Sequence, residues 1–148
     1  MLRSYAATDE PAAIELWRRT WQRHYPHIDF SARVGWWRER WRNELVAAAT
    51  ITVAECDQAM VGFVTVDPRT GYLDQIVVAP ELWGSDLGRA LLDQAKCISP
   101  AHLAVHVNQD NARAIRFYQK HGFVIAGSDV NPRSGAPLHL MRWRIAGG

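Results

Sequence analysis

The stretch from Asn108 to Phe123, NQDNARAIRFYQKHGF, decides the fold because it predicts a helix with a defined start and a defined end. Asp110 is a residue type that caps the first turn of a helix. Gly122 can end the last turn in a left-handed conformation. These two signals agree on one short helix that follows an apolar strand.

A polar amide and a phenol share one face of this predicted helix. Asn111, Ala114, Ile115 and Tyr118 follow the spacing i, i+3, i+4, i+7, so they line one stripe. The amide and the phenol lie two helical turns, or about 10 Å, apart. A linear ligand could touch both groups, which makes this stripe a candidate for chemistry.

Upstream lies LDQIVVAPELWGSDLGRALLDQAK, residues 73–96, which predicts an apolar strand, a turn rich in Pro and Gly, and an amphipathic helix. Unpaired backbone N–H groups at the start of a helix attract phosphate. Gly84 and Gly88 remove side chains that would hold a ligand away from this backbone. The segment therefore predicts an anion-binding loop, although a tight connection alone would show the same residues.

These two stretches resemble the GNAT family of acyl-CoA-dependent N-acetyltransferases, over nearly the full chain and most specifically from Gly71 to Phe123. In that family a loop with the pattern Q/R-x-x-G-x-G/A holds the CoA pyrophosphate, and a later Asn and Tyr approach the pantetheine and the thiol. The chain departs from this pattern twice, with Trp83 in place of Gln or Arg and Asp86 in place of the middle Gly.

The resemblance implies an acetyl-CoA site that acts as the source of the acetyl group. Its predicted residues are Val77, Val78, Trp83, Gly84, Ser85, Asp86, Leu87, Gly88, Arg89, Asn111 and Tyr118. The family also implies that a backbone N–H near Val77 or Val78 stabilises the tetrahedral oxyanion.

Asp86 supports two interpretations. A carboxylate at a helix start repels phosphate and competes for the same amides, which would weaken coenzyme binding. Alternatively, Asp86 is an ordinary N-cap whose side chain bonds the amide of Gly88 or Arg89 and turns away from the ligand. Arg89 could then add a compensating positive charge.

Acetyl transfer needs a proton donor for the leaving thiolate and a proton acceptor for the amine. The resemblance assigns Tyr118 the donor role, which suits a phenol with a reference pKa of about 10 beside a thiol of about 8.5. Deprotonating a lysine amine at pH 7 costs about 4.6 kcal/mol, so a base matters for such an acceptor. Asp74 is the predicted base, and His106, on one strand face with Asn108, is its rival.

Each of the two expected N-terminal helices carries an aromatic stripe, made of Ile14, Trp17 and Trp21 on the first helix and of Val34, Trp37 and Trp41 on the second. Packing explains them if both helices dock on the sheet through these rings. The alternative is an acceptor wall, since in the resembled family this region borders the acceptor site. The predicted acceptor residues are Tyr25, Trp36 and Arg133, where Arg133 lies in an expected hairpin loop and suits an acidic acceptor.

The whole chain, residues 1–148, is expected to form a single α/β domain with a GNAT-like three-layer fold. We expect a mixed, mainly antiparallel sheet of about six to seven strands with about four helices. The expected strands cover residues 2–5, 50–56, 60–67, 71–78, 102–107, 123–130 and 138–145. The expected helices cover residues 9–23, 31–48 and 87–98, and a fourth lies within the stretch from Asn108 to Phe123.

Composition and charge limit the classes of partner that we expect the protein to bind. The net charge is +2 and basic residues are mixed with acidic ones, which argues against nucleic-acid binding. No run of apolar residues approaches the length of a membrane span, and the two cysteines have no paired spacing, so we expect a reduced cytoplasmic protein. His102 and His106 would lie about 13 Å apart on a strand, so no metal site is expected.

The first functional hypothesis is an acyltransferase that moves an acetyl group from acetyl-CoA directly to a primary amine of a small molecule or peptide. The intact pair of Asn111 and Tyr118 favours it. The alternative is a noncatalytic acyl-CoA-binding or sensing domain with a degenerate phosphate loop, which Trp83 and Asp86 favour. Exposed sheet edges and aromatic helices would permit a homodimer.

Overall fold

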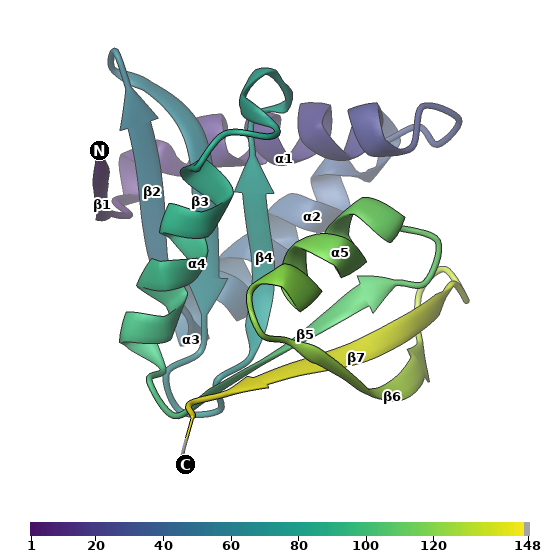
Figure 1. Cartoon of the computed structure of the whole chain (residues 1–148). Coiled ribbons are helices and arrows are strands. Elements are labelled where there is room, and N and C mark those ends of the chain that lie inside the picture. The colour runs from purple at the N-terminus through teal and green to yellow at the C-terminus, as the bar shows by residue number, and fades with distance from the viewer. Residues whose placement is uncertain (147–148) are drawn as a thin grey trace.

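The computed structural model describes residues 1–146, in which seven strands form two antiparallel sheets (Figure 1). The first sheet has the order β1-β2-β3-β4 and consists of Leu2–Ser4 (β1), Thr50–Cys56 (β2), Ala59–Val66 (β3) and Leu73–Val78 (β4). The second has the order β5-β7-β6 and consists of His102–Asn108 (β5), Val124–Val130 (β6) and Pro137–Arg144 (β7). The expected strands are confirmed, and the predicted single sheet is divided in two.

The two sheets meet at one point, where Tyr72 and Ala104 form an isolated parallel bridge. Next to it the Ala104 amide donates to the Gly71 carbonyl oxygen at 3.0 Å. From this bridge β4 and β5 run apart, as Figure 1 shows. Their facing edges are therefore not paired with each other along the rest of the described strands.

Helices cover both faces of the first sheet, which confirms the expected three-layer α/β fold (Figure 1). One side carries α1 (Glu10–His24) and a helical run made of a 3-10 turn (Ser31–Arg33), α2 (Val34–Arg40), a π-helical turn (Trp41–Leu45) and α3 (Val46–Ala48). The other side carries α4 (Leu87–Ile98) and α5 (Ala112–Lys120). The π turn is the feature of this run that the sequence pattern did not predict. Within residues 1–146, every helix is too short or too polar to cross a bilayer.

An aromatic core lies between α1, α2 and the sheet. Trp17 stacks on Trp37 with ring centroids 4.6 Å apart, and Trp41 meets Phe63 of β3 edge-to-face at 5.2 Å. Each such ring buries roughly 150–250 Å², which makes these contacts a large apolar contribution to stability. Packing is therefore the main role of the two aromatic stripes.

A second core lies on the opposite side, where α4 and α5 pack against both sheets. It is built from aliphatic side chains such as Leu91 and Leu103, together with the rings of Tyr118 and Phe123. Gly88 contributes by its size, because a Cβ atom there would approach the Phe117 ring to 3.1 Å. This glycine lets α5 lie close to α4.

The start of α5 differs from the prediction, while its end agrees. Asn111, not Asp110, is the N-cap, and its side-chain oxygen accepts from the Ala114 amide at 3.2 Å. Asp110 instead accepts a hydrogen bond from Tyr25, the residue that follows α1. Asn111 therefore precedes the helix, and the stripe that it was expected to share with Tyr118 starts at Ala114. Gly122 has the expected left-handed conformation, with φ of +93°.

Candidate active site

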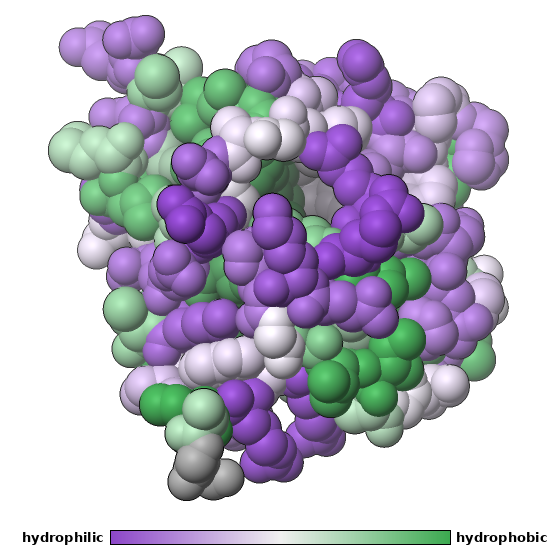
Figure 2. Space-filling model, viewed as in Figure 1, coloured by the Kyte–Doolittle hydropathy of each residue, from purple (hydrophilic) through white to green (hydrophobic). Residues whose placement is uncertain are grey.

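A cavity of about 1370 Å³ lies between the loop before α4, α5 and the first helices. Figure 2 shows the molecule hollowed between α5 and that loop, with polar side chains around the opening. With the exception of Leu87, all predicted site residues line it: Tyr25, Trp36, Asp74, Val77, Val78, Trp83, Gly84, Ser85, Asp86, Gly88, Arg89, Asn111, Tyr118 and Arg133. The Leu87 side chain packs into the second core instead. One cavity thus collects residues that are up to 108 positions apart, from Tyr25 to Arg133.

The loop before α4 has the geometry of an anion cradle. Gly84 has φ of +86°, and nothing lies within 4 Å of where its Cβ atom would be. The Ser85 hydroxyl accepts from the Leu87 amide at 3.3 Å, so Ser85 satisfies the first turn. The next amides of that turn, at Gly88 and Arg89, belong to the set for which an α-helix provides no carbonyl partner.

Asp86 does not cap α4 through its side chain, so that part of the prediction is wrong. Ser85, one residue earlier, takes the capping bond. The Asp86 side chain is 91% exposed and lies 3.8 Å from the Arg89 guanidinium. The carboxylate therefore points to solvent, and its charge is close enough to Arg89 for a weak, screened attraction.

Positive groups surround the rest of this donor side. Arg89, Arg113, Arg116 and Lys120 line the same cavity. The phosphates of a coenzyme carry several negative charges, which such groups and the free amides at a helix start can bind. Because the loop offers an open left-handed glycine, free amides and nearby cations, the residues present fit a CoA pyrophosphate.

Trp83 occupies the position of the missing Gln or Arg and ties the loop to three elements. Its indole Nε1 donates to the Val78 carbonyl oxygen at 2.8 Å. Its ring stacks on His24 of α1 at 4.5 Å, and the Arg113 guanidinium of α5 lies 4.7 Å from its centre. Burial, and secondly Arg113, lower the pKa of His24, so His24 is neutral in this stack.

His24 and Arg113 were missed by the sequence reasoning. Their contacts to Trp83 join the end of α1 to the start of α5, which no spacing rule relates. The only available hint was that Trp83 departs from the family pattern and so needed new partners.

Tyr118 lies inside the second core and reaches the cavity. Its ring packs against Phe117 at 5.3 Å and Phe123 at 5.0 Å. Burial, and secondly the neighbouring Tyr72, raise the pKa of Tyr118. No group within residues 1–146 forms a hydrogen bond with its hydroxyl in the structure, so the neutral phenol is available to donate to a ligand.

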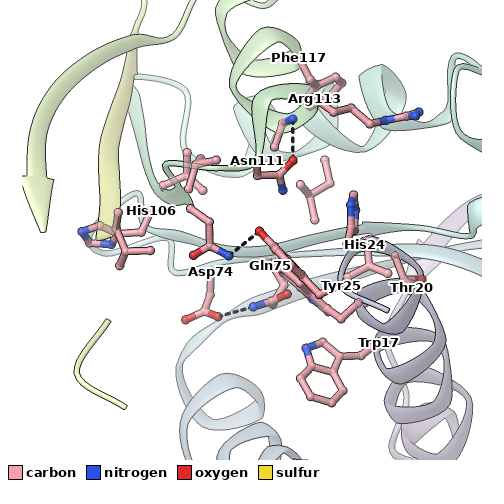
Figure 3. Close-up of a pocket in the computed structure, with 18 of the residues that line it drawn as sticks. Trp17, Thr20, His24, Tyr25, Asp74, Gln75, His106, Asn111, Arg113 and Phe117 are labelled. Carbon is pink, nitrogen blue, oxygen red and sulfur yellow. Dashed lines mark hydrogen bonds between the residues drawn. The ribbon is translucent and has the colours of Figure 1, made fainter. Parts of the chain in front are cut away.

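Asp74 lies at an irregularity of β4. Thr65 pairs with Gln75 and Val66 pairs with Leu73, so the register skips Asp74. Such a bulge re-aims the extra side chain, and Asp74 lines the cavity, as Figure 3 shows.

Both carboxylate oxygens of Asp74 accept from the guanidinium of Arg40 on α2. Gln75 adds a longer bond of 3.3 Å to Oδ1. A carboxylate in such a two-point ion pair gives up hydrogen bonds when it takes a proton. This contact weakens the predicted base role of Asp74, and Arg40 is a partner that the sequence did not reveal.

The predicted acceptor residues contact groups from distant parts of the chain. The Tyr25 hydroxyl donates to Asp110 Oδ1 at 2.8 Å and accepts from Asn108 Nδ2 at 3.0 Å, and burial is the main cause that raises the pKa of Tyr25 to about 12. The Arg133 guanidinium, from the loop between β6 and β7, lies 4.1 Å from the centre of the Trp36 ring. The wall is therefore made by α1, α2, the β5–α5 loop and the β6–β7 loop together.

His106 has hydrogen bonds at both ring nitrogens. Nδ1 lies 2.7 Å from the Tyr72 hydroxyl, and Nε2 lies 3.0 Å from Asp129 Oδ2. Burial, and secondly Asp74, raise the pKa of Tyr72 to about 12. Tyr72 and Asp129 also line the cavity and were not predicted, because their partnership depends on strand register between the two sheets.

Comparisons with known proteins agree with the fold and the cavity. A model described as the acetyltransferase (GNAT) family matches residues 10–123. The chain is 30% identical over 148 residues to the peptidyl-lysine N-acetyltransferase YiaC of Escherichia coli strain K12, covering 98% of this chain and 97% of that protein. It is 28% identical over 129 residues to the peptidyl-lysine N-acetyltransferase YjaB of Salmonella typhimurium strain LT2, covering 86% of each.

The fold also matches the crystal structure of the PaiA N-acetyltransferase of Thermoplasma acidophilum in complex with coenzyme A. The TM-score is 0.83 at 20% identity, over 98% of each chain. The family model spans more than half of the chain, and the relatives extend the match to nearly all of it. The protein belongs to the GNAT family and is an acetyltransferase that transfers the acetyl group of acetyl-CoA to an amine.

Proposed function

We propose that the acceptor is the side-chain amine of lysine in a peptide or protein. Two relatives that are 30% and 28% identical to this chain carry the name peptidyl-lysine N-acetyltransferase. The observation that carries the proposal is that one cavity joins the donor loop to a wall of aromatic side chains and carboxylates.

A lysine side chain needs two different surfaces. Its four methylenes require apolar contacts, and its ammonium group is attracted to aromatic faces and carboxylates. On the acceptor side, the cavity is lined by the aromatic residues Trp17, Trp21, Tyr25, Phe30, Trp36 and Trp37 and by the carboxylates of Asp74, Asp110 and Asp129. An extended amine with an apolar stem fits this lining better than a compact polar amine does.

On the donor side, the edge of β4 supplies the oxyanion donor. The Ala79 amide donates to the Val61 carbonyl oxygen of β3 at 2.8 Å. Backbone groups of an antiparallel strand point alternately to opposite edges, so the Val78 amide faces β5. The Val78 carbonyl oxygen also points away from β3, because it accepts from the Trp83 indole. Of the two predicted residues, we assign the oxyanion contact to the Val78 N–H.

Tyr118 completes the transfer. After the amine attacks the thioester carbonyl, the C–S bond breaks and the leaving sulfur takes the proton of the Tyr118 phenol, while the phenol oxygen regains the proton that the attacking nitrogen loses as the amide forms. Its raised pKa keeps the phenol protonated until that step. The Asn111 side chain shapes the start of α5 by capping it, and its remaining N–H groups can meet the pantetheine.

The test uses a peptide with one lysine and a blocked N-terminus. Thiol release from acetyl-CoA and the mass of the peptide are measured, for the wild type and for Tyr118→Phe. Matched acceptors are the same peptide with dimethyl-lysine, a peptide with a free N-terminus and no lysine, and a polyamine.

Acetylation of the blocked peptide that disappears with dimethyl-lysine and falls in Tyr118→Phe supports the proposal. Acetylation confined to the free N-terminus or to the polyamine overturns lysine as the acceptor. Coenzyme binding without thiol release on all acceptors would favour the noncatalytic acyl-CoA sensor.

The predictions of a cytoplasmic address, a single domain and a homodimer belong to the same proposal. Cys56 and Cys97 are free and exposed, as suits a reducing compartment.

The edge strand β6 exposes Val124, Ile125 and Val130, a surface suited to a second copy. Sedimentation of the purified chain across a concentration series tests the dimer.

A further inference from the structure

A chain of hydrogen bonds crosses the junction between the two sheets. Tyr72 forms the bridge to β5, His106 lies on β5, and Asp129 lies on the edge strand β6. The Tyr72 hydroxyl is 2.7 Å from His106 Nδ1, and His106 Nε2 is 3.0 Å from Asp129 Oδ2. Both ring nitrogens are therefore occupied, and the orientation of the ring is fixed from two sides.

The chain leads from the cavity to solvent. Tyr72 is half-buried and lines the cavity, the His106 side chain is 28% exposed, and the Asp129 side chain is 60% exposed. Because His106 has no free nitrogen, it cannot take a proton directly from a ligand in the cavity. The Tyr72 hydroxyl is the end of the chain that such a ligand would meet.

We propose that Tyr72, His106 and Asp129 form a relay that removes the proton from the acceptor ammonium. This inference rests on the proposed function only in requiring an acceptor that is protonated at neutral pH. Tyr72 is the catalytic residue because it touches the amine, and His106 and Asp129 act through it as positioning residues.

The proton moves in two linked transfers. The N–H bond of the ammonium breaks as an O–H bond forms on Tyr72, while the original O–H bond of Tyr72 breaks as an N–H bond forms on His106 Nδ1. The phenol is neutral before and after, and His106 becomes an imidazolium ion beside the Asp129 carboxylate. Its Nε2 proton then leaves through Asp129 to water, and the free amine keeps the lone pair that attacks the thioester.

The surrounding charges suit this role. Asp74 of β4 and Arg40 of α2 lie near Tyr72 but are paired with each other. From β7 the residue opposite His106 is the apolar Leu140. Tyr118 of α5 and Arg133 of the β6–β7 loop line the same cavity. The raised pKa of Tyr72 prevents phenolate formation at neutral pH, so the phenol conducts a proton and does not act as a permanent base.

The variants Tyr72→Phe and His106→Gln each interrupt the relay and keep side-chain volume. Asp129→Asn removes the charge at its end. His139→Gln is the matched control, because His139 lies on β7 in the same sheet and is outside the cavity lining. For each variant we would measure kcat/KM for the amine from pH 6 to 10, the dissociation constant of CoA, and thermal unfolding.

We expect Tyr72→Phe and His106→Gln to lower kcat/KM by about 100-fold at pH 7, and Asp129→Asn by about tenfold. The kcat/KM of Tyr72→Phe and of His106→Gln should rise about tenfold per pH unit up to the reference amine pKa of about 10.4, because these variants must bind the free amine. The kcat/KM of the wild type and of His139→Gln should reach its plateau at a lower pH. Since the residues act in series, the double variant Tyr72→Phe/His106→Gln should lose no more than either single variant.

Several results would overturn the relay. They are losses below about threefold, the same pH profile in variants and wild type, or a double variant that loses the product of the single effects. Unchanged CoA binding and unfolding temperature would show that the variants are folded. The ratios compare variants with one amine, so they judge the relay for any amine that the wild type acetylates. The proposed function fails separately, if lysine peptides are not acetylated.

Discussion

The donor side and the acceptor side of the cavity are built in different ways. The donor side comes from one continuous segment, Val77 to Arg89, with α5 beside it. The acceptor side is assembled by long-range contacts: Arg40 with Asp74, Tyr72 with His106, and Trp36 with Arg133. The residues predicted to bind the coenzyme are thus mostly close together in sequence, whereas the residues proposed for the acceptor meet only through the packing of distant elements.

The largest effect should come from breaking the packing beneath the acceptor wall. Trp37 is 1% exposed and stacks on Trp17, so Trp37→Ala should lower the free energy of unfolding by about 3–5 kcal/mol. Trp36→Ala, the neighbouring and less buried position, is the control and should lose less than about 1.5 kcal/mol. Urea unfolding measures both, and equal losses would contradict the assignment of Trp37 to the core.

The variant Tyr118→Phe tests the phenol that serves both the donor side and the acceptor side of the cavity. The phenylalanine keeps the ring packing with Phe117 and Phe123, so stability and the CoA dissociation constant should change little. Removing the proton donor should lower kcat by about 100-fold, or about 2.7 kcal/mol. Steady-state kinetics with calorimetry separates the two quantities. A loss of turnover below about threefold would count against the role of Tyr118.

The variant Asp86→Gly tests how the charge at the start of α4 affects coenzyme binding on the donor side. The exposed Asp86 carboxylate lies at the start of α4, where its charge opposes that of a phosphate. Its removal should tighten CoA binding by about twofold to fivefold, and the gain should shrink at high salt because exposed charges are screened. Asp86→Asn removes the charge without adding a glycine and is the control. Calorimetry at two salt concentrations that finds unchanged or weaker binding would refute this view of Asp86.

The smallest expected effect concerns the stack that joins the two sides. The pKa of His24 is lowered in the folded chain, so the unfolded chain binds more protons just below the ordinary value of 6.5. Stability should therefore be full above about pH 6.5 and fall as the pH drops below it. Thermal unfolding from pH 7.5 to 5 should show a flatter profile for His24→Phe than for the wild type. Identical profiles would mean that His24 does not contribute to the pH dependence.

Most of the secondary structure could be predicted, since strand alternation and helix signals depend on neighbours in sequence. The exception at the start of α5 is instructive. Asp110 and Asn111 are both good capping residues, and the choice fell on Asn111 because Asp110 bonds Tyr25, 85 positions away. At the start of α4 the difference is local: the Ser85 hydroxyl accepts from the Leu87 amide, and the Asp86 side chain makes no capping bond. At the start of α5, by contrast, a tertiary contact separates two adjacent residues with equal local preferences.

The amino-acid sequence predicted most of the residues that line the donor side, because a turn with glycine between a strand and a helix leaves backbone amides without helical partners. It also predicted the helix that carries Tyr118, although with Asp110 in place of Asn111 as the N-cap. Only the tertiary structure decided the acceptor side. The Arg40 ion pair, the cover of Trp36 by Arg133 and the line from Tyr72 to Asp129 depend on how two sheets meet and how α2 lies across them. Such contacts join side chains through space, and no local preference of the backbone specifies them.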